Sequence, residues 1–525
     1  MKNLYLLLFL LCLCACRSVE KSGGISGNSV ENHRPQFHFT PPSKWMNDPN
    51  GMAYYEGEYH LFYQYYPGGI AWGPMHWGHA VSRDLVHWQH LPVALYPDSL
   101  GLIFSGSAVV DWKNTSGFGK DGKPPLVAVF TQHLMAGEKA GRHDFQYQSI
   151  AYSNDKGRTW TKYADNPVIP NPGIHDFRDP KVFWHEASKR WVMVFAAGNH
   201  VMLWGSPDLK KWTHLSDFGR DRGSHAGVWE CPDLFPIHVE GTTETKWVLL
   251  VSINPGAPNG GSGTQYFVGQ FDGKNFTLDP EFADAASGEK AVWLDYGRDN
   301  YAGVTWSDVP ASDGRRLFLG WMSNWDYAQA VPTATWRSAM TLPRVLKLKN
   351  TAGGLRLFSE PVREMETLRG KSGEIPAGAA ENTADLSAIT GSAAVAKEIV
   401  LDLEWQAESQ PAEFGIELFN KKGEKVTAGY DPAKQQLFVD RTKSGDMSFS
   451  PKFSSRDVAP YRVTNQRLRL HFFIDAASVE MFADEGACAM TSIFFPTEDF
   501  PGLRLYGKDV RVSGKVWALK KAWRE

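Results

Sequence analysis

The chain has 525 residues, which is enough for two domains of ordinary size. Hydrophobic residues make up 42% and charged residues 22%, a composition typical of a soluble globular protein. The formal net charge of -3 gives no electrostatic reason to expect nucleic acid or an acidic polymer as a partner, so a neutral ligand fits better. The 20 Trp, 18 Tyr and 30 Phe favour β-rich structure, because flat side chains pack well on pleated sheets.

Residues 1–16 have the pattern of a bacterial lipoprotein signal peptide. An apolar run over residues 4–13 has the length of a signal-peptide core and is too short to span a bilayer permanently. It ends in the letters LCAC, which resemble the lipobox whose last Cys is acylated. We therefore expect export, a lipid on Cys16, a flexible tether over 17–34, and membrane contact through this anchor only, on the periplasmic side or the cell surface. The alternative is a plain secretory signal cut at another position.

The cysteine and histidine spacings predict neither disulfides nor a metal site. Three of the five cysteines lie in the signal, and the other two, Cys231 and Cys488, are far apart in the chain. His76 and His79 form an isolated H-x-x-H, which is more often a packed pair than a set of metal ligands. We expect no metal and no organic cofactor.

Residues 35–350 predict an all-β domain of short strands separated by turn residues, with no amphipathic helical pattern of useful length between them. The clearest expected strands are Tyr59–Tyr65, Leu126–Thr131, Trp191–Ala196, Trp247–Ser252 and Arg316–Trp321.

A weak internal repeat organises this region. A Ser-x-Asp turn with a Trp shortly after it occurs three times, and Phe271-Asp272-Gly273 is a degenerate fourth copy; the three turns are Ser82-Arg83-Asp84, Ser153-Asn154-Asp155 and Ser206-Pro207-Asp208. A unit of about 50–70 residues repeated over about 310 residues predicts a five-bladed β-propeller. The uneven spacing leaves a large β-sandwich or a solenoid as alternatives.

The rest of the chain predicts a second β domain. Residues 351–375 are more polar and irregular and are expected to be a linker. Alternating segments resume in 376–525, which fits a C-terminal β-sandwich; the clearest are Ile399–Trp405, Leu468–Ile474 and Val479–Phe482.

Three acidic motifs in the first domain are candidates for catalysis. Asp48 lies in Asn47-Asp48-Pro49-Asn50-Gly51, a rigid turn sequence that leaves an acid little freedom to reorient. Asp179 follows Arg178, which can keep an adjacent carboxyl group ionised. Glu230 stands between Trp229 and Cys231, and such apolar neighbours favour the protonated form of a carboxyl group.

These differing surroundings are what hydrolysis by paired carboxylates requires, since one group must be ionised and the other must donate a proton. In a propeller whose innermost strands line one channel, acids separated by one or two blades converge on a single pocket. Each motif also has an ordinary interpretation, because Asp-Pro is a common turn and Arg-Asp a common structural pair. Cys231 beside an acid could be a nucleophile, but a thiolate has no role in glycosyl transfer, and we assign it to the pocket wall.

Several motifs, in order along nearly the whole chain, resemble glycoside hydrolase family 32, the invertases, levanases, inulinases and fructan exohydrolases. The matching stretches are Trp45–Gly51, Phe104–Ser107, Phe177–Pro180, Trp229–Pro232, Gly320–Met322 and Gly502–Tyr506. Within the family the chain is most similar to bacterial levanases.

The resemblance implies a five-bladed propeller with a C-terminal sandwich and a retaining hydrolysis. It implies that Asp48 is the nucleophile, that Glu230 is the acid/base, that Asp179 stabilises the transition state, and that the two reacting carboxyl groups lie about 5–5.5 Å apart. It further implies contacts with the terminal fructose from Asn47, Gln64, Trp72, Phe104, Ser105, Arg178, Tyr296 and Trp321.

The expected activity is removal of terminal β-linked fructose from levan, inulin or fructo-oligosaccharides, including sucrose. An endo-levanase, a fructosyltransferase and a non-catalytic fructan-binding lipoprotein remain alternatives. The sequence leaves open the preference between β-2,6 and β-2,1 linkages and the oligomeric state.

Overall fold

The computed structural model describes residues 31–523, apart from residues 284, 289, 380, 381, 392, 393 and 410. The expected signal peptide, most of the tether and Cys16 therefore lie outside the described residues. Within the described part of the chain, no helix is long and apolar enough to cross a membrane.

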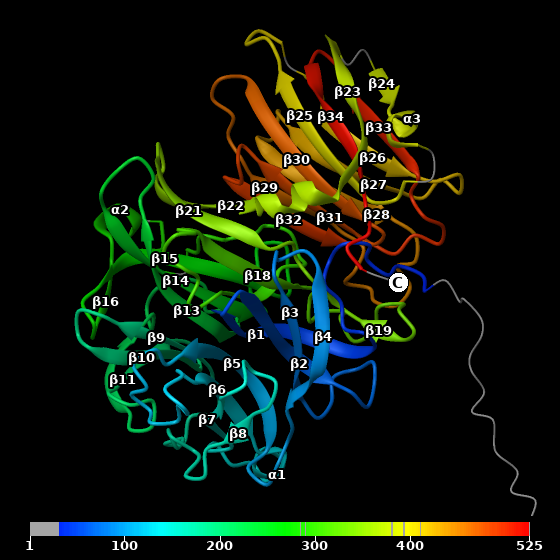
Figure 1. Cartoon of the computed structure of the whole chain (residues 1–525). Coiled ribbons are helices and arrows are strands. Elements are labelled where there is room, and N and C mark those ends of the chain that lie inside the picture. The colour runs from blue at the N-terminus through cyan, green and yellow to red at the C-terminus, as the bar shows by residue number, and fades with distance from the viewer. Residues whose placement is uncertain are drawn as a thin grey trace, which may run out of the picture. The chain divides into compact units, whose positions relative to one another are not determined.

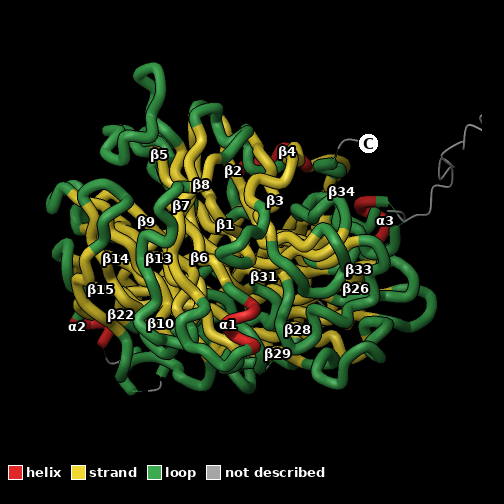
Figure 2. Tube along the Cα trace, turned by 90° about the horizontal axis from the view of Figure 1, so that it is seen from below, coloured by secondary structure: helices red, strands yellow, loops and turns green. Residues whose placement is uncertain are grey.

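Strands make up nearly all of the regular structure, as Figure 2 shows. Two sequence patterns produce them. Residues 126–133 are apolar or uncharged polar throughout and form a strand that is buried along its whole length. Residues 467–475 begin with an alternation in which Leu468 and Leu470 are buried while Arg467 and Arg469 are exposed, which is typical of a strand with one wet face.

The first domain consists of five antiparallel sheets of four main strands each, and it is the five-bladed propeller that the sequence predicts (Figure 1). The first two blades are β1 Lys44–Tyr55, β2 Glu58–Tyr66, β3 His76–Ser82 and β4 Trp88–Leu95, then β5 Leu102–Val110, β6 Leu126–His133, β7 Gln146–Ser153 and β8 Thr161–Lys162. The third and fourth are β9 Phe177–His185, β10 Arg190–Ala197, β11 Val201–Ser206 and β12 Thr213–Phe218, then β13 Val228–His238, β14 Thr245–Asn254, β15 Gly263–Phe271 and β16 Phe276–Leu278. The fifth is β17 Tyr301–Thr305, β18 Arg316–Met322, β21 Arg344–Thr351 and β22 Gly354–Pro361. Short additions are α1 Met135–Lys139, α2 Pro280–Ala283, β19 Trp336–Arg337, which pairs with β1, and β20 Ala339–Met340, which pairs with β18.

The innermost strands close the propeller into a ring. Strand β1 contacts β5, β5 contacts β9, β9 contacts β13, β13 contacts β17, and β17 returns to β1. Because each blade begins with its inner strand and continues as an antiparallel meander, all five inner strands start at the same end of the central channel. Residues early in these strands therefore meet at one mouth, and residues late in them meet at the other.

The repeated Ser-x-Asp turn joins the third and fourth strands of the first three blades. In blade one, the Asp84 carboxylate accepts hydrogen bonds from the backbone N–H groups of Val86 and His87, and the Trp88 indole donates to the Leu85 carbonyl. The other two copies make the corresponding indole hydrogen bonds. In blade four, Asp272 accepts from two backbone N–H groups at the same place. The sequence repeat is thus a turn between the third and fourth strands of the first four blades.

The second domain is a sandwich of two six-stranded antiparallel sheets. One sheet contains β23 Arg369–Ala379, β34 Arg511–Leu519, β25 Lys397–Glu404, β30 Arg467–Asp475, β31 Ser478–Ala483 and β32 Cys488–Ile493. The other contains β24 Asn382–Asp385, β33 Gly502–Gly507, β26 Phe414–Phe419, β27 Lys425–Asp431, β28 Gln436–Lys443 and β29 Arg456–Pro460. Inward side chains of both sheets, such as Leu401 and Ile416, share one buried core. A short helix, α3 Ser387–Thr390, lies between β24 and β25.

The stretch expected as a linker, 351–375, is largely structured. Strand β22 pairs with β21 over its whole length and completes the fifth blade. A 3-10 helix, η1 Arg363–Leu368, follows directly, and β23 starts at the next residue. The polar alternation of β22 explains why its sequence reads as irregular, since its outward residues face water.

Buried ion pairs join the propeller side to the sandwich. The His38 imidazole lies 2.8 Å from an oxygen of Asp475 and 2.9 Å from an oxygen of Glu480, and all three side chains are fully buried. Glu480 also binds Arg344, whose guanidinium reaches Asp295 at 2.9 Å. Burial by itself lowers the pKa of His38, but its two carboxylate partners raise it to about 9. His38 is therefore cationic at neutral pH.

We expect His38→Gln to lower the free energy of unfolding by about 3 kcal/mol at pH 7, because it leaves buried carboxylates without their cation. The pKa of His38 is raised above its unfolded value of 6.5, so its contribution is complete below that pH and is lost as the pH rises through 9. Thermal unfolding measured from pH 6 to pH 10 checks this. His471→Gln, which removes a partly exposed His–Glu pair, is the matched control and should have a smaller effect. An equal loss at pH 6 and pH 10 would contradict the assignment.

Candidate functional site

Each innermost strand is irregular near its start, at the same mouth of the channel. The pairing register with the second strand of the blade shifts at these points, which marks a β-bulge. The shifts lie at Met46–Pro49, Ile103–Gly106, Arg178–Lys181, Glu230–Asp233 and Tyr301–Val304. Asp179, Cys231 and Ala302 adopt positive φ angles of 65°, 45° and 54° there. Such bulges turn side chains out of the regular alternation, and here they direct polar groups toward one another.

Asp48 is held from three directions. Its carboxylate accepts a hydrogen bond from the Ser105 hydroxyl at 2.6 Å and from the Asn47 side-chain amide at 3.1 Å. The Trp45 indole in turn donates to the Asn47 side chain at 2.7 Å, which fixes the amide orientation. The Cys231 thiol donates weakly to the same carboxylate at 3.6 Å. Two inner strands besides its own thus contact Asp48.

Asp179 and Glu230 are connected through Arg178 and Cys231. The Cys231 backbone N–H donates to Asp179 at 3.1 Å, and its thiol lies 3.6 Å from the same oxygen. The Arg178 guanidinium donates to Glu230 at 3.0 Å and to Asp176 at 2.5 Å, and it lies 3.8 Å from Asp179. The three candidate acids therefore belong to one continuous network, although they are far apart in the sequence.

Sequence reasoning missed Tyr301, the first residue of β17. Its hydroxyl donates a hydrogen bond to the second oxygen of Glu230. With Tyr301, all five inner strands supply a polar side chain to this mouth. No motif marks this tyrosine, and only its place at the start of the fifth inner strand could have indicated it.

Burial and like charges shape the protonation of the site. Burial raises the pKa of Asp48, the Ser105 hydrogen bond opposes this, and the charge of Glu230 raises it further. Burial and the neighbouring carboxylates raise the pKa of Asp179 to about 7, against the attraction of Arg178. Burial also raises the pKa of the Cys231 thiol well above its usual value, so this thiol stays protonated and is not a nucleophile at neutral pH.

The other residues expected to contact substrate are Gln64, Trp72, Phe104, Trp321 and Tyr296. Gln64 is buried and donates to the carbonyl of Ile103, next to the bulge that presents Ser105. Trp72 and Phe104 pack edge to face with ring centroids 6.1 Å apart. Trp321 packs against Tyr301 and Trp45, and its buried indole N–H has no partner within the described residues.

Tyr296 lies elsewhere. Its ring packs against the apolar core of the sandwich, its backbone N–H donates to Ala489, and its carbonyl accepts from Asn259. Among the described residues, no hydrogen bond or ring contact joins Tyr296 to the three acids.

In the described part of the chain, no group of three or more His, Cys, Asp or Glu side chains is placed to hold a metal ion. The site contains three carboxyl groups in different environments, one guanidinium, and hydroxyl and amide hydrogen-bond donors, all at one end of a β-propeller. This arrangement defines the class of acid/base hydrolases that cleave glycosidic bonds with paired carboxyl groups.

Comparison with known proteins identifies the family. Residues 38–361 match the Glycosyl hydrolases family 32 N-terminal domain, and residues 364–518 match the Glycosyl hydrolases family 32 C-terminal domain. The chain belongs to this family and is a glycoside hydrolase.

Among its relatives is a levanase of Bacillus subtilis, 52% identical over 94% of this chain and 71% of the relative. The extracellular exo-inulinase of Aspergillus niger is 43% identical over 94% of this chain and 96% of its own length. The crystal structure of exo-inulinase from Aspergillus awamori aligns with a TM-score of 0.84 at 40% identity and covers 95% of this chain and all of that one. A β-fructofuranosidase from Schwanniomyces occidentalis complexed with fructosyl-erythritol aligns equally well at 31% identity, with 95% and 100% covered.

We expect Asp179→Asn to stabilise the fold more at pH 8 than at pH 5. Between the usual pKa of 3.8 and about 7, the folded state holds a proton on Asp179 that the unfolded chain releases, so stability from this group falls as pH rises. Asparagine cannot ionise, so the variant does not lose folding stability in this way as the pH rises. The gain in the thermal unfolding midpoint over the native chain, measured at both pH values, checks the prediction.

Asp176→Asn is the matched control, because Asp176 binds the same Arg178 but its pKa is lowered whereas that of Asp179 is raised. Burial by itself raises the pKa of Asp176, but the neighbouring Arg178 guanidinium lowers it below its usual value. Its contribution is present above its usual pKa and is lost as pH falls, so this variant should lower the unfolding midpoint at pH 8. Equal pH profiles for the two variants would contradict the charge assignment.

Proposed function

We propose that this protein is a retaining, exo-acting β-fructofuranosidase that releases terminal β-D-fructose from levan, inulin and fructo-oligosaccharides, with sucrose as a further substrate. The observation that carries the proposal is the single network formed by Asp48, Asp179 and Glu230, which come from three different inner strands. The relatives named levanase, exo-inulinase and β-fructofuranosidase support fructan as the substrate.

Asp48 is the proposed nucleophile. Its carboxylate accepts hydrogen bonds from Ser105 and Asn47, and such donors stabilise the ionised form. The charge of Glu230 works against ionisation of Asp48, so a proton on Glu230 removes the repulsion. In the first step, an Asp48 oxygen bonds to the anomeric C2 of fructose while the bond from C2 to the leaving oxygen breaks.

Glu230 is the proposed acid/base. It gives its proton to the leaving oxygen and then takes a proton from the water that attacks C2, which releases fructose and frees Asp48. Arg178 and Tyr301 each bind one of its oxygens, and this fixes the carboxyl group relative to the bond being cleaved. Its side chain is 21% exposed and so can exchange protons with water.

Asp179 and the remaining polar groups are the proposed fructose contacts. The Asp179 side chain is only 6% exposed and accepts hydrogen bonds readily, which suits fixed sugar hydroxyls near a developing positive charge. The free indole N–H of Trp321 is a further donor, because an unpaired buried donor gains from a ligand that accepts its hydrogen bond. Asn47, Gln64, Trp72, Phe104, Ser105 and Arg178 are proposed to complete the terminal subsite.

We propose exo action because Asp179 and Glu230 are only 6% and 21% exposed at the end of the ring of inner strands, where a chain end reaches them more easily than a continuous polymer. An endo-levanase needs an open cleft around the same acids. A pure binding protein gains nothing from three acids in one network, and a fructosyltransferase must exclude water from the fructosyl intermediate.

Incubation with levan, inulin and sucrose separately, followed over time by chromatography, tests the activity. Fructose as the sole early product from the two polymers supports exo action. A ladder of oligosaccharides would indicate an endo-levanase, longer chains a transferase, and no products a binding protein.

Asp48→Asn and Glu230→Gln should each reduce turnover of levan by about 10³-fold or more, because each removes a group that reacts directly. Thermal unfolding and binding of a fructo-oligosaccharide should change little. Glu366→Gln, an exchange of the same type at a side chain that is 60% exposed, is the control and should leave turnover unchanged. Near-normal turnover of an unactivated fructan by Glu230→Gln would overturn the acid/base assignment.

We further propose that the protein is exported and anchored through a lipid on Cys16. The names of extracellular relatives support export, and the lipobox-like sequence at residues 13–16 supports the anchor. Contact with the membrane would then occur through the lipid alone.

Cys16→Ala should move the protein from the membrane fraction to the soluble fraction and abolish incorporation of labelled palmitate. Cys14→Ala changes a cysteine in the same signal and should leave both properties unchanged. Membrane association that survives Cys16→Ala would contradict the lipid anchor.

A further inference from the structure

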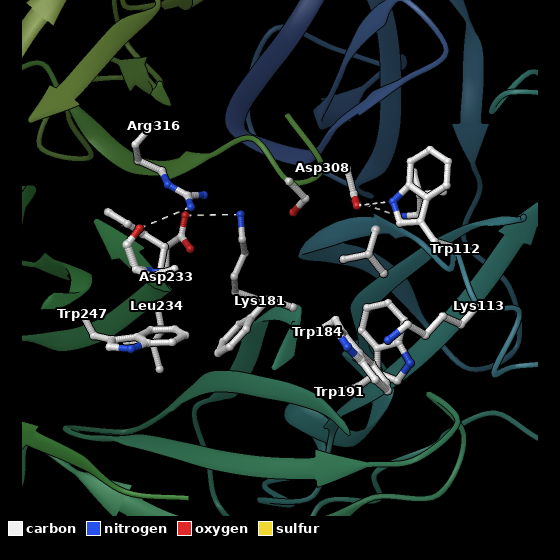
Figure 3. Close-up of a pocket in the computed structure, with 16 residues that line it drawn as sticks. Trp112, Lys113, Lys181, Trp184, Trp191, Asp233, Leu234, Trp247, Asp308 and Arg316 are labelled. Carbon is white, nitrogen blue, oxygen red and sulfur yellow. Dashed lines mark hydrogen bonds and ion pairs between the residues drawn. The ribbon is translucent and has the colours of Figure 1, made fainter. Parts of the chain in front are cut away.

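A pocket lies toward the later ends of the inner strands, away from the mouth that contains the acids, and Figure 3 shows the residues that line it. It has a volume of about 300 Å³, at the lower end of the range for small-ligand sites. It is lined by late residues of inner strands, such as Trp184 of β9 and Pro236 of β13. Since strands rise about 3.3 Å per residue, these positions are roughly 15–20 Å from Asp179 and Glu230 along the same strands. The aromatic wall of this pocket, which we call the far-mouth pocket, is therefore distant from the acids, whereas Lys181 and Asp233, which also line it, are only two and three residues along their strands from Asp179 and Glu230.

Tryptophan dominates the walls of the far-mouth pocket. Figure 3 shows Trp247 on one side of Lys181, and Trp184, Trp191 and Trp112 on the other. Trp112 is 59% exposed, one of two large hydrophobic side chains so exposed within the described residues. Its indole N–H donates to Asp308 at 2.8 Å, and its ring packs edge to face against Tyr55. The polar atom of this indole is thus satisfied and its orientation fixed, while its apolar face remains open to solvent.

Polar groups with unused hydrogen-bonding capacity lie between these rings. One oxygen of the fully buried Asp233 accepts from the Thr305 backbone and side chain and pairs with Lys181 at 3.3 Å, but the other has no partner within the described residues. The Arg316 guanidinium lies over the Phe235 ring, 4.8 Å from its centroid, and makes one long hydrogen bond, to the carbonyl of Pro236 at 3.5 Å. An unpaired buried oxygen costs free energy unless a ligand or water pairs with it, and most of the N–H groups of Arg316 remain available to a ligand.

The charges favour a neutral ligand. Lys181 pairs with Asp233, and Lys113 pairs with Glu186 at 3.0 Å. The cation Arg316 and the acid Asp308 remain, so the pocket presents both donors and acceptors without a large net charge. An anion would meet two carboxyl groups, and a cation would meet the Arg316 guanidinium. Apolar ring faces beside mixed donors and acceptors are the features that bind a sugar, whose rings have apolar faces and hydroxyl edges.

We propose that the far-mouth pocket is a second, non-catalytic binding site for a sugar unit of the fructan substrate, with Trp112 as its stacking platform. This inference rests on the proposed function for the identity of the sugar. A polymer held at the far mouth stays close to the enzyme between cleavage events, which raises the effective concentration of its free ends at the acids. A short oligosaccharide is too small to gain from this.

The test uses the full chain carrying Glu230→Gln, so that ligand is not consumed, and calorimetric titration with nystose, a neutral fructo-oligosaccharide. We expect two binding sites, and we expect Trp112→Ala in this background to weaken the second about tenfold or more while leaving the first unchanged. Trp112→Phe is the matched control: it keeps an aromatic face and loses the hydrogen bond to Asp308, and it should retain most of the second-site affinity. Thermal unfolding should show that both variants are folded, since Trp112 is exposed.

In the otherwise native chain, Trp112→Ala should raise the KM for levan several-fold and leave kcat and the turnover of sucrose unchanged. A single nystose site in the Glu230→Gln chain, or a second site indifferent to Trp112→Ala, would overturn the inference while leaving fructan hydrolysis intact. Absence of fructan hydrolysis by the native chain would instead overturn the proposed function. The two failures are therefore distinguishable.

Discussion

The site depends on holding three carboxyl groups, one buried and two partly buried, beside one guanidinium. Asp48, Asp179 and Glu230 repel one another electrostatically, and burial disfavours the ionised form of Asp48 and Asp179 further. Arg178 is the cation of this cluster and binds Glu230 and Asp176 directly. Burial and like charges therefore raise the pKa values of Asp48 and Asp179, while the Ser105 hydrogen bond opposes this at Asp48 and the attraction of Arg178 opposes it at Asp179.

The backbone supplies this arrangement through local strain. Every inner strand is irregular at the same mouth, and three residues there have positive φ angles. Such conformations cost free energy and persist only where the surrounding structure enforces them. The closed ring of inner strands and the buried ion pairs around His38 and Arg344 supply that rigidity from outside the site. The rigidity that the strained site requires therefore comes from the packing of both domains.

A propeller has two mouths, and in this chain they differ in chemistry. One contains three acids with a single guanidinium, whereas the other contains four tryptophans, an unpaired carboxylate oxygen and the Arg316 guanidinium. The same inner strands supply both, because their early residues meet at one end and their late residues at the other. Under our two proposals, a single ring of strands holds a reacting sugar at one end and offers a stacking surface to a second sugar at the other.

The sequence by itself determined the β-strands, the repeated turn that caps the blades, the family, and the motifs around Asp48, Asp179 and Glu230. These signals are local, because alternation, turn residues and short motifs are read within a few residues of each other. Only the tertiary structure decided that Tyr301 contacts Glu230, that β22 belongs to the fifth blade, and that Arg178 joins acids of different blades. Such facts depend on bulges and on ring closure, which bring together residues that no local pattern relates.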